Sequence, residues 1–161
     1  MKLEIIQPFI NAADAVFGHN MQSWAKVEDL RMETCAYRKH GIAAIVTLEG
    51  DVEGRVVLDL EAATARKMAE SVSDNEQEIA ALTTEVVCEL ANQVIGNAVT
   101  VLNDSGYRFR VQPPRIAPSD EVTMGSAHTE TLVVRFETSS GPVFLNIALR
   151  ARAPQELYAA D

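Results

Sequence analysis

The longest regular pattern of hydrophobic positions in the chain is helical and runs from about residue 76 to about residue 104. On a helical wheel of about 100° per residue, its apolar side chains gather on one side. That apolar side consists of Ile79, Leu82, Val86, Leu90, Val94 and Val101. The nearly opposite side carries Glu85, Glu89, Asn92 and Gly96, which we call the polar stripe. The pattern therefore predicts a helix that packs on a core and turns two carboxylates, one carboxamide and one glycine outward.

This long helix has sequence signals at both of its ends. The run Ser73-Asp74-Asn75-Glu76 is a capping-box pattern, which is typical of a helix start. Gly106 follows the last helical positions, where glycine often terminates a helix. We therefore expect the helix to begin near Glu76 and to end near Asp104.

Two shorter helical patterns lie earlier in the chain. Proline fits the first turn of a helix, so the apolar spacing after Pro8 predicts a helix from about Pro8 to about Met21. A second short helix is predicted from Glu61 to Val72, with Asp59 as a possible cap. Its expected inward residues are Ala62, Ala65, Met68, Ala69 and Val72.

Alternation of apolar and polar residues with a period of two predicts six strands. They lie near residues 30–36, 42–48, 55–60, 107–111, 131–138 and 142–149. The third and the last of them are apolar on both faces, which predicts a sheet covered by helices on both sides. The predicted fold class is α/β, in the order α-βββ-α-α-βββ. We expect a single domain over residues 1–150, followed by a frayed tail over residues 151–161.

Composition narrows the classes of function. The chain has 161 residues, 47% hydrophobic residues and a formal net charge of −9. That charge argues against nucleic acid or an anionic membrane as partner, because both attract basic surfaces. There is no apolar run long enough to span a membrane and no signal-peptide core, so we expect a cytoplasmic protein. Cys35 and Cys88 are interpreted as small buried residues of a reducing compartment.

The motifs of most autonomous active sites are missing. The sequence has neither a phosphate-binding loop nor a dinucleotide fingerprint, and His19, His40 and His128 are isolated from one another. We therefore predict no cofactor and no metal site of the protein's own. The absence of these motifs favours a surface that works on another protein.

The polar stripe offers a limited but usable chemistry. Glu89 and Asn92 are three residues apart, which makes them neighbours on a helix surface. A carboxamide both donates and accepts hydrogen bonds and can orient a water molecule, whereas a carboxylate can pair with a partner's lysine or arginine. Gly96 lies one turn further on and would admit a closely approaching backbone. The alternative is an ordinary solvent-exposed face, because Glu-x-x-Asn also occurs by chance.

A wider set of residues resembles the CheX family of chemotaxis phosphatases, which is related to the CheC and FliY types. The resemblance rests on four stretches that span nearly the whole chain. They are Glu89-Leu90-Ala91-Asn92-Gln93-Val94-Ile95-Gly96-Asn97-Ala98, Pro8-Phe9-Ile10-Asn11-Ala12, Gly50-Asp51-Val52-Glu53-Gly54-Arg55-Val56-Val57-Leu58 and Gly141-Pro142-Val143-Phe144-Leu145. The resemblance implies a CheC-like fold with a six-stranded, mainly antiparallel sheet.

The resemblance also implies a function, namely hydrolysis of the phospho-aspartate of a CheY-like response regulator. Asn92 would orient the attacking water and Glu89 would pair with a lysine of the regulator, which would itself hold Mg²⁺. Glu85, Gln93 and Gly96 are expected to contact that partner. Glu85 departs from the family pattern, which has Asp or Ser there.

Two points stay open at the level of sequence. CheX-type proteins are often homodimers joined through sheet edges, so a homodimer is a further expectation. The main alternative to a phosphatase is a non-catalytic CheX-like module that binds a receiver domain or a motor component. A fold relative with an unrelated partner is a third possibility.

Overall fold

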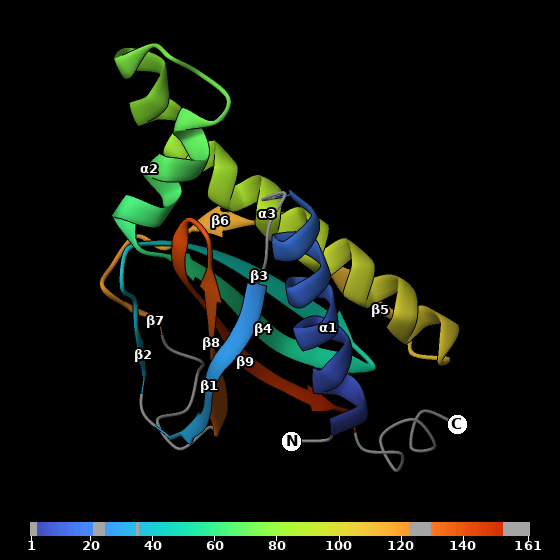
Figure 1. Ribbon diagram of the computed structural model, residues 1–161. Coiled ribbons are helices and arrows are strands. Elements are labelled where there is room, and N and C mark those ends of the chain that lie inside the picture. Colours follow the sequence, from blue (N-terminus) through green and yellow to red (C-terminus); the bar gives the residue numbers. More distant parts are fainter. Residues whose placement is uncertain (1–2, 21–24, 35, 123–129, 153–161) are drawn as a thin grey trace.

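The computed structural model describes residues 3–20, 25–34, 36–122 and 130–152. Its helices are α1 (Leu3–Asn20), α2 (Ala62–Glu70) and α3 (Glu76–Asp104). Its strands are β1 (Ala25–Glu33), β2 (Tyr37–Arg38), β3 (Ile42–Gly50), β4 (Val52–Leu60), β5 (Phe109–Val111), β6 (Arg115–Ile116), β7 (Glu121–Val122), β8 (Thr131–Thr138) and β9 (Gly141–Ala151). All described residues form one α/β unit built on one large sheet (Figure 1).

The large sheet has seven strands in the order β1-β8-β9-β4-β3-β5, and β6 also pairs with β3. Every one of these pairs is antiparallel. The six predicted strands are therefore present, and β6 brings the sheet to seven. The first strand begins at Ala25 and ends at Glu33, earlier than predicted, and the last one reaches Ala151, just beyond the predicted domain boundary. Residues 153–161 of the predicted tail lie outside the described residues.

One face of the sheet carries the main core under α1 and α3 (Figure 1). The predicted start of α1 at Pro8 is wrong, because the helix begins at Leu3 and contains Pro8. Proline removes a hydrogen bond to the carbonyl of Glu4. The burial of Ile5 and Ile6, which are only 1% and 5% exposed, outweighs that loss.

No helix among the described residues covers the opposite face of the sheet, so the expectation of helices on both faces is wrong. A two-stranded ribbon of β2 and β7 lies over it. The small core between ribbon and sheet consists of Tyr37, Ala43, Ile45, Val57, Ala117, Val122, Val133 and Phe144. The strand pattern correctly indicated two covered faces, but it could not say what covers the second one.

Asp59 anchors this second face instead of capping α2. Its carboxylate is fully buried and accepts hydrogen bonds from the Tyr37 hydroxyl at 2.6 Å, the His40 backbone N–H at 2.6 Å and the Gly41 backbone N–H at 3.0 Å. Burial, followed by the charge of Asp59, raises the pKa of Tyr37, so its hydroxyl stays protonated as a donor. The cap position of α2 is occupied by Glu61, whose side chain makes no capping hydrogen bond.

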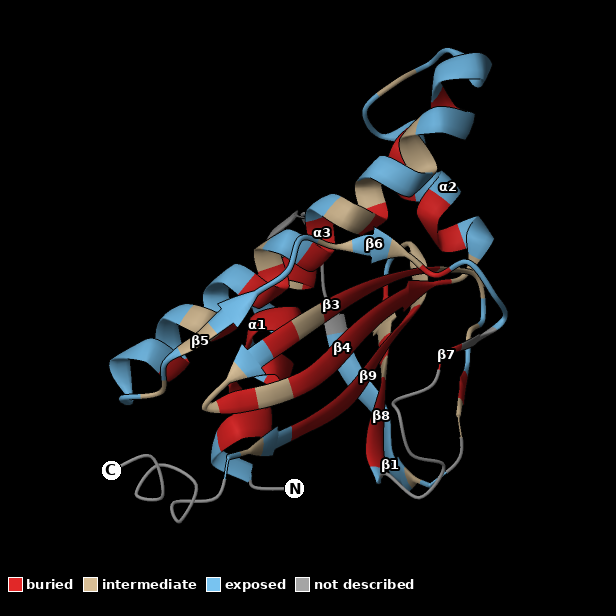
Figure 2. Ribbon diagram, turned by 180° about the vertical axis from the view of Figure 1, so that it is seen from behind, coloured by how far each residue is buried: buried red, intermediate tan, exposed pale blue. Residues whose placement is uncertain are grey.

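The helical arm, which we define as α2, the first half of α3 and their connection, projects beyond the edge of the sheet (Figures 1 and 2). The start of α3 at Glu76 confirms the prediction, with Asn75 as the cap that accepts from the Gln77 N–H at 2.9 Å. Arg66 of α2 holds the arm together, because its guanidinium lies 2.7 Å from Glu76 and 3.0 Å from Glu70.

Two inward predictions fail in α2 and its connection to α3. Ala62 is exposed, and Val72 is 68% exposed because the helix already ends at Glu70. Among the described residues, no helix is both long and apolar enough to cross a membrane.

Replacing Asp59 tests whether this carboxylate anchors the ribbon face. Asp59→Ala leaves one buried and two partly buried donors without their acceptor, so we expect it to lower the free energy of unfolding by about 3 kcal/mol. Urea unfolding monitored by circular dichroism measures this loss. Asp59→Asn keeps one acceptor oxygen and should lose clearly less. A loss below about 1 kcal/mol for Asp59→Ala would contradict the anchoring role.

Candidate functional site

The polar stripe lies along the middle of α3, and its four residues Glu85, Glu89, Asn92 and Gly96 are all exposed. The opposite side of the same turns is buried in the main core by Val87, Leu90, Ala91, Val94, Ile95 and Ala98. Leu82 and Val86, predicted to face inward, are only half-buried. The inward prediction for Val101 is wrong, because this side chain is 49% exposed.

The polar groups of the stripe have few partners within the chain. Gln93 is half-buried beside the stripe, and its side-chain amide donates to the Glu89 carboxylate at 3.0 Å. Glu85 and Asn92 make no hydrogen bond or ion pair with any residue that the structure describes. Other exposed carboxylates, such as Glu70 and Glu76, are paired with arginine. The stripe therefore presents a carboxylate and a carboxamide that are free to bind another molecule.

Gly96 leaves bare backbone at the end of the stripe. An added Cβ would meet no atom within 4 Å, so the fold does not require glycine here. Glycine inside a helix costs roughly 1 kcal/mol relative to alanine. Since the fold does not need this glycine, its missing side chain is better explained by a partner whose backbone approaches the helix closely.

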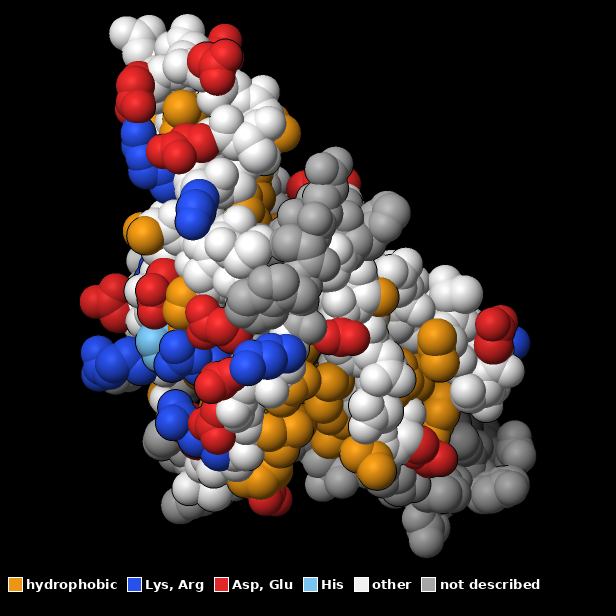
Figure 3. All heavy atoms as spheres, in the orientation of Figure 1, with side chains coloured by type: hydrophobic (Ala, Val, Ile, Leu, Met, Phe, Trp, Pro, Cys, Tyr) orange, Lys and Arg blue, Asp and Glu red, His pale blue; other side chains and the backbone are white. Residues whose placement is uncertain are grey.

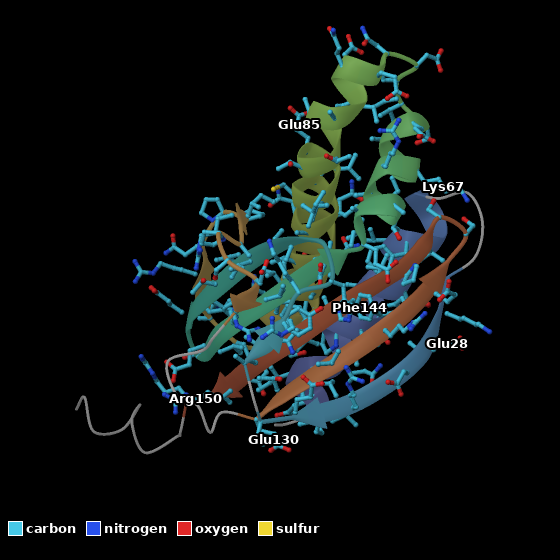
Figure 4. All side chains as sticks on the ribbon, turned by 90° about the vertical axis from the view of Figure 1, so that its left-hand side faces the viewer. Glu28, Lys67, Glu85, Glu130, Phe144 and Arg150 are labelled. Carbon is cyan, nitrogen blue, oxygen red and sulfur yellow. The ribbon has the colours of Figure 1, made fainter. Side chains whose placement is uncertain are left out.

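A groove opens beside the stripe, between the two helices of the arm. Its volume is about 720 Å³. Lining residues come from α2 and its connection (Lys67, Met68, Ser71, Val72), from α3 (Leu82, Glu85, Val86, Glu89, Leu90, Gln93) and from the β8–β9 turn (Ser140). Figure 4 shows Lys67 on α2 and Glu85 on α3, on opposite sides of the arm. Asn92 and Gly96 are not among the lining residues.

Sequence reasoning did not anticipate the α2 side of this groove. Lys67, Ser71 and Ser140 carry no motif, and their proximity to the stripe depends on how α2 packs against α3. Val72 gave no signal either, because the sequence pattern placed it inside the helix and predicted that it faces inward.

Two kinds of catalytic group, a metal ion and a cysteine nucleophile, have little support among the described residues around the polar stripe. The described residues contain no group of three or more His, Cys, Asp or Glu that could hold a metal ion. Cys88 lies on the same helix, but burial raises the pKa of its thiol, which disfavours the nucleophilic thiolate. The arrangement is suited to complement a reactive group that another molecule brings.

An antiparallel sheet with α1 and α3 across one face is the fold of the CheC-like chemotaxis proteins. The chain belongs to the CheX family, because the family described as chemotaxis phosphatase CheX matches residues 42–137, more than half of the chain. A search of the curated proteins gives no match.

Solved structures share the fold. A CheC-like superfamily protein from Shewanella sp. PV-4 is similar with a TM-score of 0.76 and 19% identity, over 94% of this chain and 100% of that one. The chemotaxis protein CheX from Desulfovibrio desulfuricans has a TM-score of 0.74 and 19% identity, over 92% and 99% of the two chains. The CheX–CheY–BeF₃–Mg²⁺ complex from Borrelia burgdorferi has a TM-score of 0.69 and 26% identity, over 92% and 99%.

Replacing Gly96 tests whether the fold needs a glycine at this position. Gly96→Ala introduces a methyl group into open space and removes the entropic cost of a helical glycine, so we expect the free energy of unfolding to rise by about 0.5–1 kcal/mol. Thermal and urea unfolding measure this rise. Destabilisation by Gly96→Ala would show that the glycine has a structural role.

Proposed function

We propose that this protein accelerates the hydrolysis of phospho-aspartate on a CheY-like response regulator and docks on it through the polar stripe. One observation carries the proposal. Glu89 and Asn92 lie side by side on the exposed face of a helix whose opposite face is buried in the core. In a chain of the CheX family, these two side chains would reach into the phosphorylation site of the partner.

Each of the two residues has a separate role in the proposed reaction. Asn92 would hold the attacking water in line with the phosphoryl group, since its carboxamide can accept from the water and donate to a phosphoryl oxygen. Glu89 would accept a hydrogen bond from the regulator's lysine. Phosphoryl transfer needs mainly positioning and charge stabilisation, so a single amide added to the regulator's own Mg²⁺ and lysine can suffice.

The contacts around Glu89 support this assignment. Gln93 donates to one oxygen of the Glu89 carboxylate and leaves the other oxygen free to accept from a partner. A side chain held in one orientation loses less entropy on binding. Gly96 would admit the regulator's backbone, and Glu85 would lie at the border of the same contact.

The Borrelia complex supports the choice of partner, because it joins a similar CheX to CheY in the presence of BeF₃ and Mg²⁺. If the receiver holds the metal ion, the phosphatase needs no metal site of its own. The non-catalytic alternative, a module that binds a receiver domain or a motor component, uses the same surface and differs only in the rate of dephosphorylation.

Replacing Asn92 separates catalysis from binding. Asn92→Ala removes the group that orients water, so we expect the acceleration of phosphate release from a phosphorylated CheY-like regulator to fall by about 100-fold or more. Phosphate release with and without the protein measures the effect. Asn103→Ala is the matched control, because Asn103 is also an exposed asparagine of α3 but lies outside the stripe and outside the Glu89–Ala98 stretch.

The possible results distinguish the hypotheses. Unchanged acceleration by Asn92→Ala would reject the mechanism. A wild-type protein that binds the phosphorylated regulator but never shortens the lifetime of its phosphate would establish the non-catalytic module instead. If no regulator binds at all, the partner belongs to another class.

We further propose that two copies join through the edge strand β1. This strand is nine residues long and pairs on one side with β8, whereas the opposite edge of the sheet is formed by the short strands β5 and β6. Val27, Leu30 and Met32 of β1 are 43%, 51% and 46% exposed. Apolar side chains gather on the face that carries β1 and α1 (Figure 3).

The sequence of β1 complements itself in one antiparallel register. Glu28 is the extra residue of a bulge, because Val27 and Asp29 pair with consecutive residues of β8. Pairing two copies about Leu30 then brings Asp29 opposite Arg31 and Val27 opposite Met32. Lys26 comes opposite Glu33. Opposite charges and apolar pairs across strands each stabilise an antiparallel sheet.

A charge swap tests this dimer register. Asp29→Arg would bring two arginines together across the two-fold axis, so we expect the dimer to dissociate at concentrations at which the wild type remains associated. Adding Arg31→Asp restores opposite charges and should restore the dimer. Sedimentation velocity measures both. A monomeric wild-type protein, or a double variant that stays dissociated, would reject the register.

A further inference from the structure

We propose that the groove between α2 and α3 selects the receiver, by binding a segment with one exposed apolar side chain between a basic and an acidic side chain. The inference rests on the proposed function, because it assumes that a receiver docks on the polar stripe. It adds the residues Lys67 and Val72, which neither the Glu-x-x-Asn pattern nor the proposed reaction uses.

The groove and the stripe are continuous. Glu85 and Glu89 belong to both, and Gln93 lines the groove while it holds the Glu89 carboxylate. A receiver that brings its lysine to Glu89 must therefore lay the adjoining part of its surface over the groove.

The groove has an apolar floor, and one exposed apolar residue stands on its α2 side. Leu82 and Val86 are half-buried on the α3 side, and Val72 is 68% exposed on the α2 side. An exposed valine beside half-buried apolar side chains gains free energy when a partner's side chain removes it from water. The apolar floor and Val72 therefore favour a bound segment with an apolar residue at its centre.

The charges on the two rims are opposite and unsatisfied. Glu85 lies on α3 and Lys67 lies on α2 (Figure 4). Neither side chain makes an ion pair or hydrogen bond with any described part of the chain. Arg66, the neighbour of Lys67, is by contrast paired with both Glu70 and Glu76. A receiver segment with its basic side chain toward α3 and its acidic side chain toward α2 would satisfy both rims in a single orientation.

Because the groove lies beside Asn92 and not around it, the groove sets affinity and partner choice, while the carboxamide sets the chemical rate. Receivers share the residues of their phosphorylation sites, so discrimination among them has to come from the surface around those sites. The two rims of opposite charge provide that discrimination, since a segment with reversed charges would meet like charges on both sides.

The experiment measures binding and hydrolysis separately. The probe is a CheY-like receiver domain of the host, activated with beryllofluoride and Mg²⁺, chosen as the one that the wild-type protein binds most tightly. We expect Val72→Asp and Lys67→Glu each to raise its Kd by roughly three- to tenfold. Both side chains are exposed, so neither variant should disturb folding, which urea unfolding checks.

Two matched controls lie elsewhere on the surface. Val101→Asp introduces the same charge at an exposed valine of α3, outside the groove, and Arg110→Glu reverses an exposed charge on β5. Both should bind the receiver as the wild type does. If Val72→Asp and Lys67→Glu also bind like the wild type, or if the controls weaken binding equally, the groove does not select the receiver.

Measuring phosphate release in the same samples distinguishes the proposed phosphatase activity from the proposed selection of the receiver by the groove. Loss of acceleration in Asn92→Ala together with unchanged binding by the groove variants would reject the groove alone. Weakened binding by the groove variants without any acceleration by the wild-type protein would support the groove and reject the phosphatase. If no receiver binds the wild-type protein, both proposals fail.

Discussion

The burial of one side of α3 is the constraint on which the rest of the site depends. Val87, Leu90, Ala91, Val94, Ile95 and Ala98 are buried between the helix and its neighbours. Truncating a single large side chain in such a core typically costs about 2–5 kcal/mol, so rotating the helix about its axis would cost far more. The rotation of α3 is therefore fixed, and with it the direction in which Glu89 and Asn92 point. A stiff helix thus replaces the loops that position functional groups in many enzymes.

The same constraint explains why an open surface can be specific. The polar stripe stands on a packed helix, so its side chains lose little backbone freedom when a partner binds. The helical arm extends the surface beyond the sheet (Figure 2), where α2 packs against α3 and Arg66 bridges Glu70 and Glu76. The groove follows from the way these two helices meet, whereas the stripe follows from one helix alone.

This difference marks how much could be predicted from the sequence. The limits of α3 and of β8, and the exposure of the stripe, follow from local periodicity and were predicted correctly. The strands β2, β6 and β7 have two residues each, which is too short for any periodicity to show. The role of Asp59 depends on segments distant in the chain, and the local pattern assigned it incorrectly. The Lys67 rim of the groove was missed for the same reason. Val72 was assigned incorrectly because α2 ends at Glu70, two residues before it.

Electrostatics decides how such a surface must recognise its partner. The chain carries a net charge of −9, and the phosphorylation site of a receiver is itself rich in carboxylates. Long-range attraction therefore gives no help, and at physiological salt it would be screened beyond roughly 8 Å in any case. In the proposed docking, productive encounters would then depend on short-range pairs, such as Glu89 with a lysine, and on apolar contact at Val72. Interactions of this size give fast dissociation, which would suit a phosphatase that has to release each regulator after a single hydrolysis.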